Sequence, residues 1–186
     1  QWIGGLFYFS EDIQIDSISF DSLAPGNPQN PFYAVQTQDT TSWAAFASVN
    51  YTVSDKLKLR GGVRYTDDKK DFAASRIEAT TSGPHRIHSD STNVSWDASG
   101  TYSLTKDTNL FARVATGYRA PSMQGRLFGL ADRPSFADAE KALSVEAGIK
   151  QELFDRRARM SASVFQYRVK DKQLTAGSGT INMNQL

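Results

Sequence analysis

The residues best placed for covalent chemistry are Ser103 and Lys106, which have the Ser-x-x-Lys spacing of serine acyl-enzymes. That motif needs a helix to bring the lysine beside the serine, whereas here it spans the end of a predicted strand and a turn. The chain also has no cysteine, which excludes a disulfide framework, a thiolate zinc site and a cysteine nucleophile. The sequence contains no glycine-rich phosphate loop, His-Glu-x-x-His motif or nucleophile elbow. We therefore expect no catalytic residue, no cofactor and no enzymatic activity.

Two segments offer metal-ligand atoms, and both fit solvated loops better than metal sites. His85 and His88 provide two imidazoles, but no carboxylate or third donor is fixed beside them in the sequence. Residues 67–71 (Asp-Asp-Lys-Lys-Asp) carry carboxylates that suit calcium, yet the interleaved lysines favour a solvated charge cluster. We therefore predict no metal site.

The composition alone describes a near-neutral protein of 186 residues. Its 21 basic and 20 acidic side chains give a net charge of +1. The chain therefore has no excess of positive charge with which to bind the phosphates of a nucleic acid. Hydrophobic residues make up 39%, but no apolar run reaches the ~18 residues of a transmembrane helix. No signal peptide is visible at the N-terminus.

The dominant pattern along the chain is an alternation of apolar and polar residues with period two, which is typical of strands with two different faces. It is clear in residues 43–53, 57–66, 94–104, 110–119 and 143–153, and no charged residue stands on any of the five apolar faces. Weaker strands are predicted at 2–10 and 158–169, and 137–143 is a candidate helical turn. We therefore predict an all-β antiparallel fold of about seven strands.

The connections between these strands alternate in length. Short turns are predicted near 54–56, 105–109 and 154–157, and long loops over about 11–38, 67–92 and 120–142. Long structureless loops are uncommon in compact domains, whereas short turns on one side and long loops on the other are typical of outer-membrane β-barrels. The alternative is a soluble β-sandwich binding module, such as a lectin, whose aromatic residues fill its core.

Aromatic residues stand where a membrane-spanning sheet would need them. Trp43 and Tyr51 share a face eight residues apart, which is about 26 Å along a strand and about 20 Å of height at a tilt of ~40°. That height is close to the separation of the aromatic girdles of a barrel. The predicted girdle consists of Trp43, Tyr51, Tyr65, Trp96, Tyr102 and Tyr118.

Four stretches resemble the TonB-dependent outer-membrane receptors, in the expected order. WAAFASVNYTVSDKLKLRGGVRYTDDKKDF (43–72) is similar to a strand–turn–strand of that family, and NLFARVATGYRAPS (109–122) to a strand ending in a Gly-Tyr-Arg-x-Pro corner. EKALSVEAGIKQELFDRRARMSASVFQYRVKDKQ (140–173) resembles its Glu-x-Gly-x-Lys strand, short turn and next strand. The opening WIGGLFYF is similar to a strand upstream of these. The proline of the corner should end a strand, where Arg119 could hydrogen-bond loop carbonyls.

The resemblance implies the fold and the function. Such receptors are barrels of about 22 strands whose lumen holds an N-terminal plug domain with a TonB box. They lie in the outer membrane of Gram-negative cells and take up ferric siderophores, vitamins or saccharides, powered by the TonB complex. Residues 1–186 would then be a partial β-barrel domain, lacking the plug, the TonB box and the C-terminal strands. Its partners would be outer-membrane lipid, the plug, the TonB complex and a small ligand. The alternative within this fold is a passive porin-like channel.

Two groups of residues are candidates for contacts inside such a barrel. Charged residues on the polar faces would line the lumen and pair either with the plug or with neighbouring strands. Aromatic residues of the predicted long loops would either contact a ligand or fold inward over the plug. The lumen candidates are Arg60, Arg64, Asp97, Arg113, Arg119, Glu146, Lys150 and Glu152, and the loop aromatics are Phe20, Phe32, Tyr33, Phe128 and Phe136.

Overall fold

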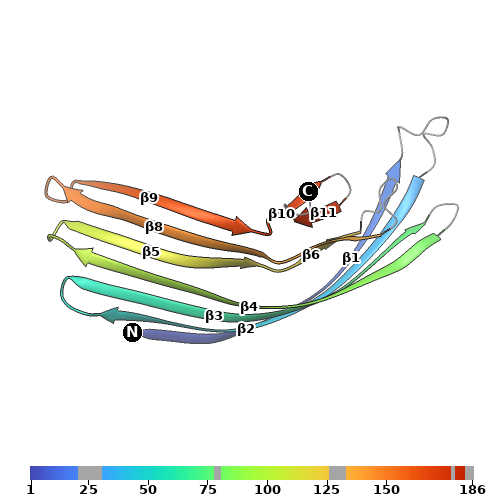
Figure 1. Cartoon of the computed structure of the whole chain (residues 1–186), viewed down its shortest axis with the longest axis horizontal. Coiled ribbons are helices and arrows are strands. Elements are labelled where there is room, and N and C mark those ends of the chain that lie inside the picture. Colours follow the sequence, from blue (N-terminus) through green and yellow to red (C-terminus); the bar gives the residue numbers. More distant parts are fainter. Residues whose placement is uncertain (21–30, 78–80, 126–132, 177–178, 183–186) are drawn as a thin grey trace.

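A computed structural model describes residues 1–20, 31–77, 81–125, 133–176 and 179–182 of the chain. Seven strands form one curved antiparallel sheet in the order β1-β2-β3-β4-β5-β8-β9, and two short hairpins lie outside it (Figure 1). None of the described residues forms a helix with the length and apolarity needed to cross a membrane. The strands are β1 (Trp2–Phe20), β2 (Pro31–Thr52), β3 (Leu57–Ile77), β4 (Thr81–Ser103), β5 (Thr108–Arg119), β6 (Ser122–Gln124), β7 (Ser135–Ala137), β8 (Glu140–Leu153), β9 (Ala158–Lys170), β10 (Gln173–Ala176) and β11 (Gly179–Asn182).

The seven predicted strands are all present, and each pairs with the next strand that the alternation predicts. The three short turns are confirmed at residues 53–56, 104–107 and 154–157, all at one end of the sheet (Figure 1). Ser103 ends β4 and Lys106 lies in the turn that follows, so the Ser-x-x-Lys spacing has no helix to support it. Ser103 instead donates a hydrogen bond to Asn109 across this turn, at 2.7 Å.

The prediction of long loops at 11–38 and 67–92 was wrong, because both segments are mostly strand. β1 continues to Phe20 before β2 begins at Pro31, and β3 continues to Ile77 before β4 begins at Thr81. Side chains are polar on both faces over much of these extensions, which hides the alternation. The backbone pairing between neighbouring strands does not depend on hydropathy, and it continues.

The third predicted long loop, 120–142, is shorter than expected and partly ordered as strands. β6 pairs with β7 as a small hairpin outside the main sheet. The predicted helical turn at 137–143 is also wrong. Residues from Glu140 onward belong to β8, where they pair with β5, so Glu140 stands opposite Arg119.

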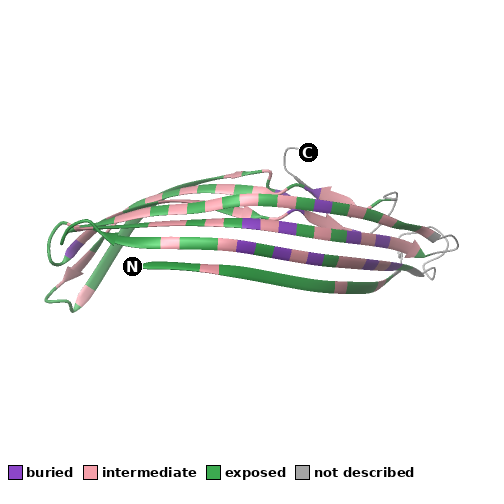
Figure 2. Ribbon diagram, turned by 90° about the horizontal axis from the view of Figure 1, so that it is seen from below, coloured by how far each residue is buried: buried purple, intermediate pink, exposed green. Residues whose placement is uncertain are grey.

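Cross-strand pairing brings the five apolar faces together on one side of the sheet. Val49 stands opposite Gly61, Gly61 opposite Ala98, Ala98 opposite Val114, and Val114 opposite Val145. We call this side the apolar face and the other the polar face. Figure 2 shows burial alternating along several strands, as expected for a sheet whose two sides have different surroundings.

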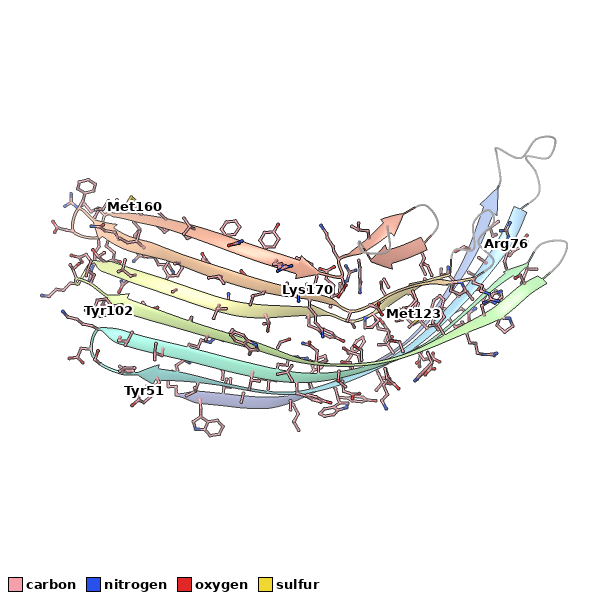
Figure 3. The ribbon with its side chains drawn as sticks, in the orientation of Figure 1. Tyr51, Arg76, Tyr102, Met123, Met160 and Lys170 are labelled. Atoms are coloured by element: carbon pink, nitrogen blue, oxygen red, sulfur yellow. The ribbon has the colours of Figure 1, made fainter. Side chains whose placement is uncertain are left out.

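The buried core is small and lies on the polar face. Phe72 and Ala74 of β3 are covered there by Met123 of β6. Figure 3 shows Met123 far from the end of the sheet where Tyr51 and Tyr102 lie beside the short turns. On the apolar face large side chains stay exposed, including Val49 at 49% and Tyr51 at 64%. Exposed apolar side chains over several strands mark a surface that contacts something other than water.

Candidate functional site: the polar face of the sheet

All eight charged residues selected from the sequence lie on the polar face. Arg60 stands opposite Ser99, Ser99 opposite Arg113, and Arg113 opposite Glu146, so one row of this face crosses four strands. The other five share the alternation of these residues along β3, β4, β5 and β8: Arg64, Asp97, Arg119, Lys150 and Glu152.

A pocket of about 400 Å³ on the polar face gathers three of the arginines around one carboxylate. Arg60, Arg64 and Arg113 line it together with Asp97. The side chain of Asp97 extends over Gly62, where an added Cβ would lie only 2.8 Å from the Asp97 Oδ1 atom. Three guanidinium groups against one carboxylate give the pocket a positive potential, which favours an anionic partner.

Arg64 is held in place by two contacts with residues beside the pocket. Its Nε donates a hydrogen bond to Thr66 Oγ1 at 3.1 Å. Its guanidinium carbon lies 5.1 Å from the centre of the Phe7 ring, within the range of a cation–π contact. The guanidinium group is therefore positioned before any partner binds.

The charged side chains near the end of β8 have partners within the chain. Glu152 pairs with Arg156 at 2.9 Å and with Arg159 at 3.2 Å. The Lys150 ammonium lies 5.1 Å from the centre of the Phe111 ring. The arginine pocket, between β3 and β5, differs from this end of β8 because three arginines gather there with Asp97.

A short segment that follows β5 crosses the polar face beyond the arginine pocket. We call residues 120–125 the strap. Lys70 Nζ donates a hydrogen bond to the Pro121 carbonyl at 2.7 Å, and the Gly125 amide donates to Gln36 Oε1 at 3.0 Å. An added Cβ at Gly125 would lie 2.5 Å from the Ala74 Cβ, so only glycine allows this close approach. The strap is thus fixed to β2 and β3.

Gln173 fastens the start of the strap to the segment before β8. Its side-chain Nε2 donates to the carbonyls of Ala120 and Asp138, both at 2.9 Å, and its backbone amide donates to Glu140 Oε2 at 3.0 Å. Gln173 is only 7% exposed. β5 does end at Arg119, as the corner motif predicts. Sequence reasoning did not identify Gln173, Lys70 or Gln36, because no local pattern links these positions to residues 50 to 90 positions away.

Five of the six predicted girdle aromatics lie on the apolar face. The rings of Trp43 and Tyr65 contact each other there, with centroids 5.3 Å apart. Tyr118 departs from this group, because its hydroxyl donates a 2.9 Å hydrogen bond to Ser91, which has the polar-face alternation of β4. The pairing of β4 with β5 stops at Asp97, so the Tyr118 side chain is free to turn toward the polar side. The five are Trp43, Tyr51, Tyr65, Trp96 and Tyr102.

The predicted loop aromatics lie mostly in strands, because those strands are longer than expected. Phe20 ends β1, and Phe32 and Tyr33 are near the start of β2. Tyr33 is 46% exposed and has the alternation of Trp43, so it lies on the apolar face. Phe136 lies in β7, and Phe128 falls outside the described residues. Of the four that the structure describes, Phe136 belongs to the hairpin that β7 forms with β6 of the strap.

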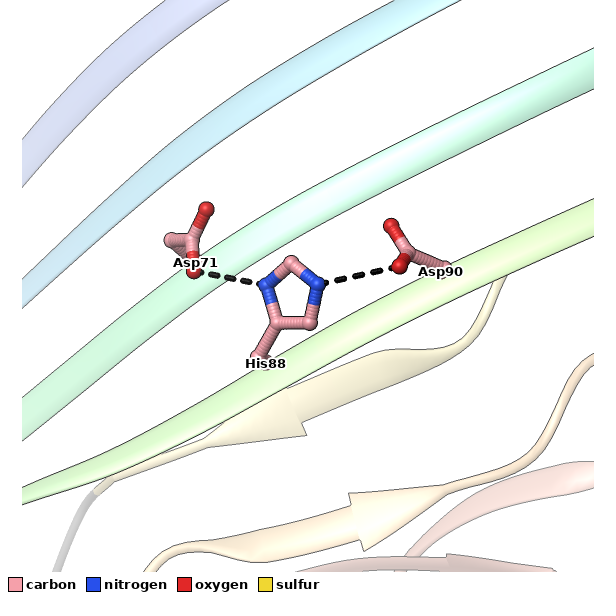
Figure 4. Close-up of polar contacts among 3 residues, drawn as sticks. All are labelled: Asp71, His88 and Asp90. Atoms are coloured by element: carbon pink, nitrogen blue, oxygen red, sulfur yellow. Dashed lines mark hydrogen bonds and ion pairs between the residues drawn. The ribbon is translucent and has the colours of Figure 1, made fainter.

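His85 and His88 cannot share a metal ion, because they lie on opposite faces of β4. His85 stands opposite Ala74 of the polar face and His88 opposite Asp71 of the apolar face. His88 contacts Asp71 at 2.7 Å and Asp90 at 3.1 Å (Figure 4). These hydrogen bonds, first that to Asp71, raise the pKa of His88 above its usual 6.5. Within the described residues, no group of three or more acidic or histidine side chains could hold a metal.

Comparisons with known proteins agree on one family. The family model "TonB dependent receptor-like, beta-barrel" matches residues 1–185. The chain is 30% identical over 138 residues to the pesticin receptor of Yersinia pestis, a match that covers 72% of this chain and 20% of that receptor. This chain therefore spans about a fifth of the curated relatives that it matches.

Solved structures share the fold. The ferric yersiniabactin uptake receptor FyuA of Yersinia pestis superposes with a TM-score of 0.80 at 22% identity, covering 97% of this chain and 27% of that one. The ferric-catecholate import receptor Fiu of Escherichia coli K12 superposes with a TM-score of 0.66 at 15% identity, covering 97% and 30%. In both cases almost all of this chain matches about a quarter to a third of a much longer one.

Proposed function

Because the chain belongs to the TonB-dependent receptor β-barrel family, we propose that it forms part of the barrel of a receptor for energised uptake of a ferric siderophore across the outer membrane. The observation that carries this proposal is the pairing of five uncharged strand faces into one exposed apolar surface, with the charges on the opposite face. A barrel in lipid needs this division, because its outside contacts hydrocarbon and its lumen contacts water or protein.

The apolar face is the proposed lipid contact. Four of its aromatic residues form two groups along the strands: Tyr51 and Tyr102 near the short turns, and Trp43 and Tyr65 further along. Trp96 stands opposite Val63 and lies between these two groups. Amphipathic rings at these two levels suit the two interfaces of the bilayer. The short turns would then face the periplasm, and the long strand extensions beyond Trp43 would stand outside the cell.

The polar face is the proposed lumen wall, which the plug domain of the receptor covers. The arginine pocket supports this proposal, because three arginines line it and Asp97 is the acidic residue among its described lining residues, with Glu146 opposite Arg113 beside it. A plug surface that presents carboxylates would form charge-assisted hydrogen bonds with these guanidinium groups. The plug would in turn carry the TonB box through which the inner-membrane complex supplies energy.

The class of ligand is inferred from related receptors, and it concerns the whole receptor of which this chain is a part. Similar solved proteins are a ferric yersiniabactin uptake receptor, a ferric-catecholate import receptor and an alcaligin outer-membrane receptor. Iron complexes of siderophores are therefore the first candidates for this receptor. Vitamins and saccharides, which the family also carries, are the next.

The test uses the full-length receptor in a Gram-negative host that lacks its own siderophore receptors. We expect uptake of radioactive iron from ferric yersiniabactin, a ferric catecholate or ferric alcaligin, and we expect the uptake to stop when the gene for TonB is deleted. A passive channel would pass the complex equally well with and without TonB, and that result would overturn the proposal. The matched control is a receptor whose TonB box has been removed.

A further inference from the structure

Three cations gather on the apolar face at the ends of β8 and β9 that lie away from the short turns. Lys141 stands directly opposite Lys170, and Arg168 lies two residues before Lys170 on the same face. The register fixes this face, because Lys141 shares the alternation of Val145. All three side chains are exposed, and Figure 3 shows Lys170 at the end of β9. We call Lys141, Arg168 and Lys170 the basic cluster.

The basic cluster has no acidic partner within the described residues. None of the ion pairs or side-chain hydrogen bonds found there involves any of its three members. Glu140 is next to the cluster in sequence, but it has the opposite alternation and accepts from the Gln173 amide. Asp171, which follows β9, is likewise engaged. Like charges directly opposite each other destabilise a sheet, so the cluster favours a bound anion.

The basic cluster stands where the proposed lipid-facing band ends. On the apolar face of β8 no charged residue stands from Leu153 to Leu143, a stretch of about 33 Å along the strand and about 25 Å of height at a tilt of ~40°. The apolar band of a barrel has about this height. Lys141 and Lys170 are two residues beyond this stretch. Arg168 is at its edge, where a long cationic side chain can reach the headgroups. The cluster therefore lies at the level of the lipid headgroups.

Lys69 lies at the same level on another strand and differs from the basic cluster in its surroundings. It is on the apolar face of β3, thirteen residues from the nearest short turn, the same count as for the two lysines of the cluster. Lys69 stands opposite Asp90, and Asp67 and Asp71 are two residues away on the same face. An anion at this level would therefore be repelled beside β3 and attracted beside β8 and β9.

From this geometry we propose that the basic cluster binds the phosphates of lipopolysaccharide, the phosphorylated glycolipid of the outer leaflet. The guanidinium group of Arg168 suits two phosphate oxygens at once, and the two lysines add compact positive charges. Val145 and Val164 are exposed on the same two strands, nearer the short turns, where they suit the acyl chains of the same lipid. The assignment rests on the proposed placement of the apolar face in lipid. It adds a lipid partner that is distinct from the transported ligand.

The test measures binding of lipopolysaccharide to the full-length receptor in detergent by native mass spectrometry, which counts bound molecules by their mass. The wild type should bind lipopolysaccharide at least about tenfold more tightly than the same lipid after its phosphates are removed. Lys141→Gln, Arg168→Gln and Lys170→Gln should each weaken binding about fivefold, which is the effect of one cation near a charged lipid surface. The control, Lys69→Gln, removes the same charge at the same level and should not weaken binding.

Equal affinity for the phosphorylated and the dephosphorylated lipid would overturn the proposal without the need for any variant. A loss in Lys69→Gln as large as that in Lys170→Gln would also overturn it, because binding would then respond to net charge alone. Inorganic phosphate at millimolar concentration should not displace the lipid, and displacement would identify a site for free phosphate instead. Heat-modifiable migration in gels checks that each variant is folded. Binding in detergent needs no transport, so it is independent of the outcome of the iron-uptake experiment.

Discussion

The ammonium group of Lys70 in β3 donates a 2.7 Å hydrogen bond to the carbonyl oxygen of Pro121, which lies 51 residues further along the chain. Burial lowers the pKa of Lys70, and the nearby Asp68 carboxylate opposes this shift. A half-buried lysine bound to a backbone carbonyl stabilises one position of the strap. The single contact thus joins a strand of the sheet to the segment that covers it.

Replacing Lys70 with methionine should loosen the strap while leaving the sheet intact. A hydrogen bond from a charged donor contributes about 1.5–3 kcal/mol, so local opening should become at least about tenfold more frequent. Hydrogen exchange of the Gly125 amide, which is bonded to Gln36, would report this change in the full-length receptor. Lys69→Met, on the opposite face of β3, is the control and should not alter the exchange rate. Unchanged exchange in Lys70→Met would show that other contacts hold the strap.

His88 should titrate above its ordinary range, because Asp71 and Asp90 both accept hydrogen bonds from its charged form. Its folded pKa is raised above 6.5, so the interaction is complete below pH 6.5 and is lost as the pH rises through the folded pKa. NMR of labelled histidine, assigned with His88→Gln, would measure the pKa. Asp71→Asn should lower it more than Asp90→Asn does, and Asp39→Asn, in the same row, should change it least. Equal pKa values in wild type and Asp71→Asn would contradict the structure.

A charge introduced on the apolar face should destabilise the barrel. Leu143→Arg places a guanidinium group on the apolar face of β8, within the proposed lipid-facing band, and should cost about 2–4 kcal/mol. The adjacent Ser144→Arg places the same group on the polar face, outside the arginine pocket, and should be tolerated. Urea titration of the receptor folded into phospholipid vesicles would measure both free energies of unfolding. Equal losses would refute the assignment of the two faces.

Two glycines on neighbouring strands should respond differently to alanine. A Cβ at Gly148 of β8 would collide with the Ala162 carbonyl and lie 2.7 Å from the Phe111 ring, whereas one at Gly117 of β5 would meet only the Ala142 Cβ at 3.5 Å. Gly148→Ala should therefore lower the free energy of unfolding by about 1–3 kcal/mol through overpacking. Gly117→Ala should be close to neutral in the same urea titration. A larger loss at Gly117 would contradict the described packing.

The sequence by itself determined the seven strands, their order and the division of the sheet into two faces. Successive side chains of a strand point to opposite faces, so a sheet with one apolar side needs an apolar residue at every second position. The alternation in segments such as 43–53 and 143–153 therefore shows which residues face that side. The placement of Arg60, Arg64 and Arg113 on one side followed from the same rule. The family resemblance followed as well, because its motifs are local.

Only the tertiary structure decided where the strands end and what covers them. Beyond Trp43 polar side chains are common on both faces, and apolar residues such as Ile13 and Phe72 lie on the polar face. The alternation therefore no longer marks a strand that backbone hydrogen bonds continue to hold. The side chain of Tyr118 left its expected face because β4 and β5 stop pairing at Asp97. The strap depends on Lys70 and Gln36, which meet it only after the sheet has formed. Contacts between positions so far apart in the chain produce no periodic pattern in a single sequence.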